Sequence, residues 1–291
     1  MHSVAQDYFL GIDGGGSSCR ARIRMADGRL CAEARGGAAN IHQNFAGALA
    51  TMVEVAGKAA AAAHVAPEQL HAGLGLAGVT TAAEAQRVMH SGLPFARTMV
   101  DSDGLIACLG AHGGEDGGIV ICGTGSAAFA LQKGVRLGLG GHGFLLGDHG
   151  SGAVMARKAV GEALLAFDGL RRPTPLTRAL LAKFQNQPSQ CVAWAKSASS
   201  RDFAAFVPEI IAFAHQGESL ALRLVREALA DLTALAHGLH QRGVERICLI
   251  GGLADELQAF AKPAFLAQFV APRADPLEGA LLLARRAEPW P

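Results

Sequence analysis

The stretch Phe9-Leu-Gly-Ile-Asp-Gly-Gly-Gly-Ser-Ser-Cys-Arg-Ala-Arg-Ile23 decides the fold that we expect for this chain. An apolar segment ends at Asp13, three glycines follow, and arginines then alternate with smaller apolar residues. This pattern predicts a strand, a tight turn and a second, half-buried strand. Because glycine has no Cβ, the turn lets backbone N–H groups approach a ligand closely, and Ser17 adds a hydroxyl. We therefore expect phosphate binding by Gly14, Gly15, Gly16 and Ser17; the alternative is a glycine-rich hairpin with an incidental aspartate.

Two familiar phosphate-binding turns do not describe this stretch. The lysine of the P-loop is absent, and a strand rather than a helix follows the glycines, which excludes a dinucleotide-binding turn. A carboxylate beside a glycine hairpin suits a metal–nucleotide complex.

Length, composition and charge narrow the range of possible functions and partners. The chain has 291 residues, half of them hydrophobic, and a net charge of +1. This length suits two domains, and the charge argues against nucleic-acid or membrane-surface partners. We see no apolar run of membrane-spanning length and no signal peptide. The six cysteines form no C-x-x-C pair, so we expect reduced, buried thiols and a cytoplasmic location.

The strand–turn–hairpin pattern occurs a second time. An apolar segment, Gly118–Cys122, leads into Gly123-Thr-Gly-Ser126, and another predicted hairpin follows. Such a repeat suggests two similar halves that face each other across a cleft. Both glycine turns would then hold one polyphosphate, the second through Gly123, Thr124, Gly125 and Ser126.

Further polar residues follow predicted strands. Asp101 and Asp103 come after the strand Arg97–Val100 and are candidates for a base that takes a hydroxyl proton. One of them is expected to be only a helix cap, because a helix is predicted over 103–112 with Ser102 or Asp103 at its N-cap. Asn40 and Asp148 suit paired hydrogen bonds to sugar hydroxyls. Gly251 and Gly252, after another strand, could admit a base or ribose.

Together these motifs resemble the sugar kinases of the actin-like ATPase superfamily, in the branch of N-acetylglucosamine kinase, bacterial glucosamine kinase and the BadF-type ATPases. The resemblance covers nearly the whole chain. It rests on Gly11–Ser17, Cys122–Ser126, Gly251–Leu253, Pro276–Ala280 and the segment Ser102–His112.

The resemblance implies an α/β fold of two ribonuclease-H-like domains, of the actin and hexokinase type, with ATP and sugar in the cleft between them. The first domain would span 1–117 and be completed by a C-terminal helix over 276–291. The second would span 118–275 and contain a helical insertion. A homodimer is also implied.

The resemblance also implies residue roles. Asp103, rather than Asp101, would be the catalytic base. Asp13 would organise the water shell of Mg²⁺ bound to ATP. Asn40, Asp103, Gly143 and Asp148 would bind the sugar. The chain departs from the usual pattern at His142, where a tryptophan is common, and at His149, where a glutamate is common.

We therefore expect an ATP-dependent kinase that phosphorylates the 6-hydroxyl of N-acetylglucosamine or of glucosamine. Loss of a carboxylate at His149 favours the acetylated sugar slightly, with the loop 36–40 and Phe144 around the acetyl group. A preference for glucosamine would require another carboxylate, such as Glu115 or Asp116. The alternatives are a BadF-type activase, which needs closely placed exposed cysteines, a sugar-binding regulator, which needs an N-terminal helix-turn-helix, and an actin-type assembly ATPase.

Overall fold

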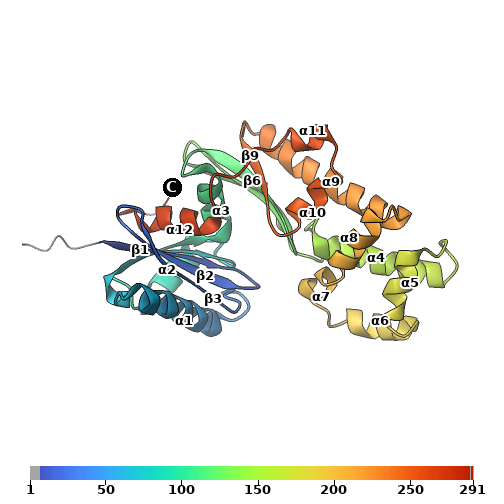
Figure 1. Cartoon of the computed structure of the whole chain (residues 1–291), viewed down its shortest axis with the longest axis horizontal. Helices are drawn as coiled ribbons and strands as arrows, with labels where there is room; N and C mark the ends of the chain where they lie inside the picture. Colours follow the sequence, from blue (N-terminus) through green and yellow to red (C-terminus); the bar gives the residue numbers. More distant parts are fainter. Residues whose placement is uncertain (1–6, 289, 291) are drawn as a thin grey trace, which may run out of the picture. The chain divides into compact units, whose positions relative to one another are not determined.

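A computed structural model describes residues 7–288 and 290. The chain divides into two compact units (Figure 1). Unit 1 comprises residues 1–117, 129–136 and 271–291, and unit 2 comprises residues 118–128 and 137–270. The expected domain of residues 118–275 differs from unit 2 at two places. Residues 129–136, around a hairpin turn, group with unit 1, and the closing segment of unit 1 begins at Ala271.

Unit 1 is built on a five-stranded sheet of order β3-β2-β1-β4-β5. The strands are β1 (Tyr8–Gly14), β2 (Cys19–Met25), β3 (Leu30–Gly36), β4 (Leu70–Leu76) and β5 (Arg97–Ser102). The pairs β1–β2 and β2–β3 are antiparallel, whereas β1, β4 and β5 run parallel to one another. The carboxyl ends of these parallel strands therefore meet at one edge, which receives Asp13 and Asp101.

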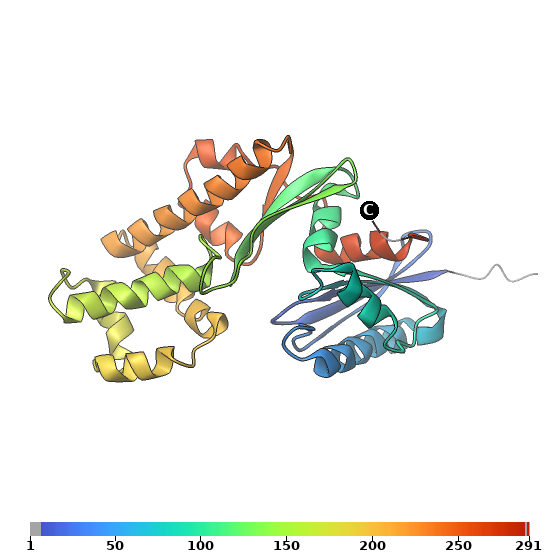
Figure 2. The same cartoon turned by 180° about the vertical axis from the view of Figure 1, so that it is seen from behind.

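Helices cover both faces of this sheet (Figure 2). The helix α1 (Phe45–Ala63) packs against β2 and β3 on one face. On the other face α12 (Pro276–Ala284) packs against β1, β4 and the helix α3 (Asp103–His112). A short 3-10 helix, η1 (Pro67–Gln69), precedes β4, and α2 (Ala82–Met89) lies against β5. The expected ribonuclease-H-like arrangement of unit 1 is thereby confirmed.

The helix α1 corrects one sequence-based expectation. By length and composition it is apolar enough to cross a membrane, although we expected no such segment. Its Asn44 N-cap accepts a hydrogen bond from the Gly47 N–H, and Met52, Val55 and Ala59 are buried in the core of unit 1. A helix with one face buried against a sheet is the ordinary core helix of an α/β domain.

Four glycines let α12 approach the sheet and α3 at backbone distance. Gly11 and Gly73 are register partners on β1 and β4. A Cβ at Gly73 would lie 2.1 Å from the Ala280 carbonyl oxygen, and one at Gly11 would lie 2.7 Å from that of Leu277. Between the helices, a Cβ at Gly279 would lie 1.8 Å from the Ile106 oxygen and one at Gly110 would lie 2.1 Å from the Asp275 oxygen. Only glycine fits these four positions without displacing backbone.

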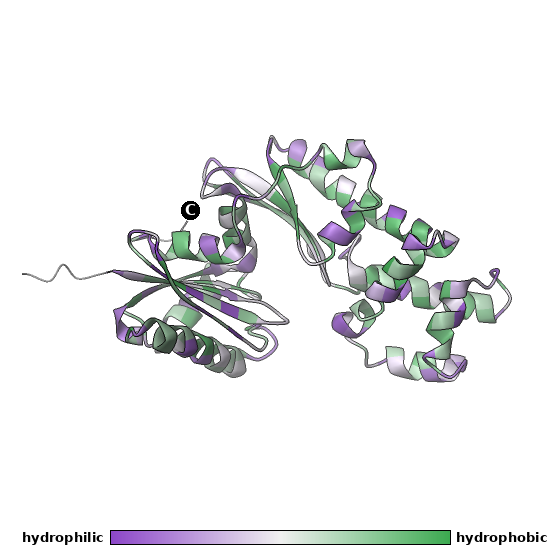
Figure 3. Ribbon diagram, viewed as in Figure 1, coloured by the Kyte–Doolittle hydropathy of each residue, from purple (hydrophilic) through white to green (hydrophobic). Residues whose placement is uncertain are grey.

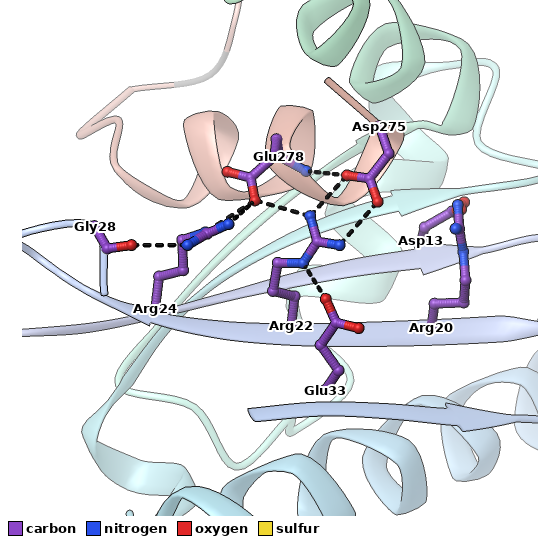
Figure 4. Close-up of polar contacts among 8 residues, drawn as sticks. All are labelled: Asp13, Arg20, Arg22, Arg24, Gly28, Glu33, Asp275 and Glu278. Atoms are coloured by element: carbon purple, nitrogen blue, oxygen red, sulfur yellow. Dashed lines mark hydrogen bonds and ion pairs between the residues drawn. The ribbon is translucent and has the colours of Figure 1, made fainter. Parts of the chain in front are cut away.

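An arginine of β2 fixes the start of α12 (Figure 4). Arg22 donates to both carboxylate oxygens of Asp275, at 2.8 and 2.9 Å, and to Glu278 at 2.8 Å. It also donates to Glu33 of β3 at 2.6 Å, and its side chain is only 14% exposed. A planar guanidinium suits this bidentate geometry. The network joins β2 and β3 to residues about 250 positions later in the chain.

The second sheet has four strands in the order β8-β7-β6-β9. The strands are β6 (Gly117–Cys122), β7 (Ser126–Gln132), β8 (Val135–Gly140) and β9 (Ile247–Ile250), with β6 and β9 parallel. Lys133 and Gly134 connect β7 to β8 with φ of 49° and 76°, as a tight hairpin turn requires. The strand order matches the first four strands of unit 1, so the internal repeat inferred from the sequence is present in the fold.

The rest of unit 2 is helical, as the sequence predicts from Ser151 onward. Its helices carry hydrophobic and hydrophilic stretches, which is typical of elements with one buried side (Figure 3). They are α4 (Gly152–Phe167), α5 (Pro175–Ala182), α6 (Pro188–Ala195), α7 (Ser200–Ala204), α8 (Val207–His215), α9 (Ser219–His240), α10 (Ala254–Gln258) and α11 (Pro263–Leu266).

The glycine contacts give a stability prediction. We expect Gly73→Ala to lower the free energy of unfolding by at least ~2 kcal/mol, because the new methyl group would overlap backbone atoms of α12. Gly57→Ala in α1 is the matched control, because a Cβ there meets nothing within 4 Å. It should raise the free energy of unfolding by about 0.5–1 kcal/mol through helix propensity. Urea unfolding of both variants measures these changes, and equal effects would contradict the close approach of α12.

Candidate active site

In unit 1 the first glycine turn is held open by backbone bonds to neighbouring loops. The Gly15 N–H donates to the Ser18 oxygen, and the Gly15 and Gly14 oxygens accept from Ala39 and Ala77. The carbonyl groups are thus used inside the protein, while Gly16 and Ser17 are exposed. This leaves the tip of the turn accessible to a ligand, as the sequence predicts for a phosphate-binding turn.

Asp13 lies near the end of β1, beside this turn, and its carboxylate is held by Arg20 of β2. The sequence analysis gave this arginine no role. Arg20 donates to Asp13 Oδ2 through Nη2 at 2.6 Å and through Nε at 3.2 Å. Among the described residues no hydrogen bond reaches Asp13 Oδ1. One carboxylate oxygen is therefore paired with a guanidinium, and the other has no protein partner among the described residues.

Asn40 lies next to the same turn. Its Oδ1 accepts from the backbone N–H groups of His42 at 2.9 Å and Gln43 at 3.2 Å, which fixes the loop that follows β3. Its Nδ2 faces Gly16, since a Cβ there would lie 3.9 Å away. A ligand hydroxyl could accept a hydrogen bond from Nδ2, whereas Oδ1 already carries two bonds.

Asp101 and Asp103 have different environments, although only one residue separates them. Asp101 is buried and forms a bidentate pair with Arg136 at 2.8 and 2.9 Å; Arg136 also donates to the Trp290 oxygen. Ser102 is the N-cap of α3, because its hydroxyl oxygen accepts from the Leu105 N–H. The strand β5 thus continues two residues beyond its predicted end, and Asp101 is a structural residue. Sequence reasoning could not find Arg136, which lies 35 positions away.

Asp103 starts α3 and keeps an accessible edge. The protein around it removes part of the hydration of its carboxylate, which raises its pKa, and the negative charge of Asp13 raises the pKa further. The Gly104 N–H, 2.9 Å from Oδ1, opposes this shift only in part. A carboxylate with a raised pKa is the better proton acceptor, so Asp103 rather than Asp101 has the environment of a general base.

In unit 2 the second glycine turn rests on the start of α4. The Gly123 and Thr124 oxygens accept from the Gly152 and Ala153 N–H groups, at 2.9 and 3.2 Å. Thr124 is exposed, and its hydroxyl has no hydrogen-bond partner among the residues that the structure describes. The hydroxyl of Ser126, by contrast, is buried and donates to the His149 oxygen at 2.6 Å. Of the two predicted hydroxyls, Thr124 is the one available to a phosphate.

The turn at Gly251 and Gly252 lies beside Gly123. A Cβ at Gly123 would be 3.9 Å from the Gly252 nitrogen. Gly251 has φ of +112°, and a Cβ there would lie 2.3 Å from the Cys122 oxygen, so only glycine fits. Both glycines are exposed. Unit 2 therefore brings together two of the predicted nucleotide motifs.

Asp148 lies against the second glycine turn. A Cβ at Gly125 would be 2.8 Å from Asp148 Oδ2, and Oδ1 accepts from the Gly143 N–H at 3.1 Å. Asp148 adopts φ of 53°, which aims its side chain back at this loop. Burial raises the pKa of Asp148, and the Gly143 N–H, His142 and His149 offset this rise only in part. Both histidines at which the chain departs from the resembling family thus act on Asp148.

Phe144, Glu115 and Asp116, which the sequence suggested as possible sugar contacts, each interact with another residue of the chain. The Phe144 ring packs 5.1 Å from that of Phe203. Glu115 pairs with Arg273 at 2.8 Å, and Asp116 accepts from the Lys133 N–H at 2.7 Å. Both carboxylates already have protein partners, Asp116 at the hairpin and Glu115 at the segment before α12.

The raised pKa of Asp103 can be measured directly. We expect its carboxyl ¹³C shift to titrate above the ordinary value of about 3.9 for an aspartate. Asp103 would therefore lose its ability to accept a proton at a higher pH than a surface aspartate as the pH falls. In Asp13→Asn the midpoint should move down, because a like charge is removed. An unchanged midpoint in that variant would show that the two carboxylates do not interact.

Comparison with known proteins agrees with this arrangement. The family model of the BadF/BadG/BcrA/BcrD ATPase family matches residues 10–284. The chain is 40% identical over 285 residues to a glucosamine kinase of Vibrio cholerae, which covers 97% of each chain. It is 27% identical to an N-acetylmuramic acid/N-acetylglucosamine kinase of Clostridium acetobutylicum, over 77% of this chain and 76% of that one.

A solved structure from Chromobacterium violaceum, whose proposed activity is that of an N-acetylglucosamine kinase, superimposes with a TM-score of 0.90 at 34% identity. The superposition covers 97% of this chain and all of that one. The expected two-domain sugar-kinase fold is confirmed by this similarity. From its first strand to its closing helix, the chain belongs to the BadF/BadG/BcrA/BcrD ATPase family.

Proposed function

We propose that this protein is an ATP-dependent hexosamine kinase that phosphorylates the 6-hydroxyl of glucosamine or N-acetylglucosamine. The observation that carries the proposal is Asp103, an accessible carboxylate with a raised pKa at the start of α3, while its neighbour Asp101 is neutralised by Arg136. The names of the relatives support the substrate class.

In this proposal Asp103 accepts the proton of the attacking hydroxyl, which makes that oxygen a better nucleophile toward the γ-phosphate. Asn40 Nδ2 and the Asp148 carboxylate hold sugar hydroxyls. Thr124 and the tips of the two glycine turns, with Gly251 and Gly252, hold ATP. Their accessible backbone N–H and hydroxyl groups suit phosphate oxygens.

When bound with ATP, Mg²⁺ would neutralise part of the negative charge of the phosphates. Asp13 fits such an ion, because its Oδ1 has no protein partner among the described residues and lies at the glycine turn. The expectations of a homodimer and of a cytoplasmic location stay predictions.

The buried thiols support a kinase over an activase. All six cysteines are free, and only Cys31 among them is not buried. Burial raises the pKa of Cys19 and of Cys122 to about 12, so their thiolates are disfavoured. An iron–sulfur cluster needs thiolate ligands that lie close together.

Paired variants test the assignment of the base. Asp103→Asn keeps the shape of the side chain and removes the proton acceptor, so kcat should fall roughly 10²–10⁴-fold. Asp101→Asn should weaken the pairing with Arg136 and cost about 1–3 kcal/mol of folding stability, with turnover retained. Steady-state kinetics with urea unfolding of both variants measures this. If Asp101→Asn abolishes turnover and Asp103→Asn does not, the base is assigned to the wrong residue.

The choice of sugar is tested by kcat/KM for glucosamine, N-acetylglucosamine and glucose. We expect both amino sugars to exceed glucose by at least about tenfold, because a site built for one polar group discriminates against its absence. We place glucosamine first because of the relative that is 40% identical over the whole chain. This reverses the slight preference drawn from the sequence. Equal values for all three sugars would refute the proposal, whereas a preference for N-acetylglucosamine would refute only the ranking.

A further inference from the structure

A cavity with charged residues in its lining lies among the helices of unit 2. None of these lining residues carries a proposed catalytic role. The volume of the cavity is about 280 Å³. Three segments contribute to it: α4 through Glu162, the loop between α4 and α5 through Arg171 and Arg172, and the first turns of α9 through Ser219 and Arg223. Thr174, the N-cap of α5, completes its polar lining.

The charges of this cavity are unequal. Three guanidinium groups face one carboxylate, that of Glu162. Arg223 is held in place, because it pairs with Glu162 at 2.9 Å and with Glu227 of its own helix at 2.8 Å. Arg171 lies 3.8 Å from Glu162, and Arg172 has no ion-pair or hydrogen-bond partner among the described residues. Arg171 also donates to the Leu170 oxygen at 3.1 Å. The lining therefore keeps an excess of positive charge, and Arg172 is the arginine that has no protein partner among the described residues.

The uncharged groups of the cavity also suit an anion. The hydroxyl oxygen of Thr174 accepts a hydrogen bond from the Thr177 N–H at 3.3 Å, which leaves the hydroxyl proton available to donate. The hydroxyl of Ser219 has no partner among the described residues. No acidic residue lies in the first turn of α5, so the positive end of its dipole is not compensated there. The carboxylate of Glu218 caps α9 through the Ala221 N–H and is not part of the lining.

We propose that this arginine cavity binds a small phosphate monoester dianion. Guanidinium forks match phosphate oxygens in pairs, and three arginines suit a doubly charged group better than a carboxylate. The volume is at the lower end of ligand pockets, which suits a phosphate or a hexose phosphate rather than a nucleotide. This inference does not depend on the proposed kinase activity.

Calorimetric titration of the full chain with inorganic phosphate, and separately with glucosamine 6-phosphate, tests the proposal. Ionic strength is held constant with chloride, because exposed charges are screened by salt. The test variant is R171A/R172A, which removes the two loosely held arginines from an exposed loop. The control is R178A/R226A, which removes two exposed arginines outside the cavity and changes the net charge equally.

We expect affinity to fall about tenfold or more in R171A/R172A and to stay unchanged in R178A/R226A, since each lost charged hydrogen bond is worth at least a factor of ten. Binding at the glycine turns would be the same in all three proteins, so only the difference reports on the cavity. Tighter binding of the ester than of phosphate would assign the sugar phosphate as ligand, and equal binding would assign the phosphate group alone. Equal affinities in all three proteins, or equal losses in both variants, would overturn the proposal.

Discussion

The close contact of α12 with the sheet of unit 1 is the constraint on which the rest of the structure depends. Gly11 and Gly73 remove the side chains that would separate helix from sheet, and Gly110 and Gly279 do the same between α3 and α12. Arg22 then binds two carboxylates at the start of α12, Asp275 and Glu278, and is itself held by Glu33 of β3 (Figure 4). Because α3 begins at Asp103, the position of the candidate base is set by a helix from the far end of the chain.

Asp101 at the end of β5 and Asp103 at the start of α3 differ in role: Asp101 is structural, and Asp103 is the candidate base. The Asp101 carboxylate is neutralised by Arg136, which also donates to the Trp290 oxygen. Asp103 has no arginine partner among the described residues; burial raises its pKa, and the negative charge of Asp13 raises the pKa further. The same logic recurs at Asp13, where Arg20 takes one oxygen and leaves the other. Arg136 occupies both carboxylate oxygens of Asp101, whereas Arg20 occupies only Oδ2 of Asp13.

In unit 2 the candidate site residues at the second glycine turn are positioned by backbone hydrogen bonds rather than by ion pairs. The carbonyls of Gly123 and Thr124 are used by the start of α4, so the turn presents the Thr124 hydroxyl outward. Gly125 leaves room for the Asp148 carboxylate at a distance that a side chain there would not allow. A candidate sugar ligand and a candidate phosphate turn are therefore mutually dependent, and His142 and His149 tune the carboxylate between them.

The sequence by itself determined the strands, the glycine turns, the internal repeat and the long helices, because local periodicity and glycine placement report directly on backbone conformation. It also separated Asp103 from Asp101 through a family resemblance. Only the tertiary structure decided which polar groups already have protein partners. Asp101 is paired with Arg136, Asp13 is paired with Arg20, and the Ser126 hydroxyl donates to the His149 oxygen. These partners lie 7 to 35 positions away. Asp13 and Arg20 are register partners of the β1–β2 hairpin, whereas Arg136 and His149 reach their partners only where the fold brings separate segments together.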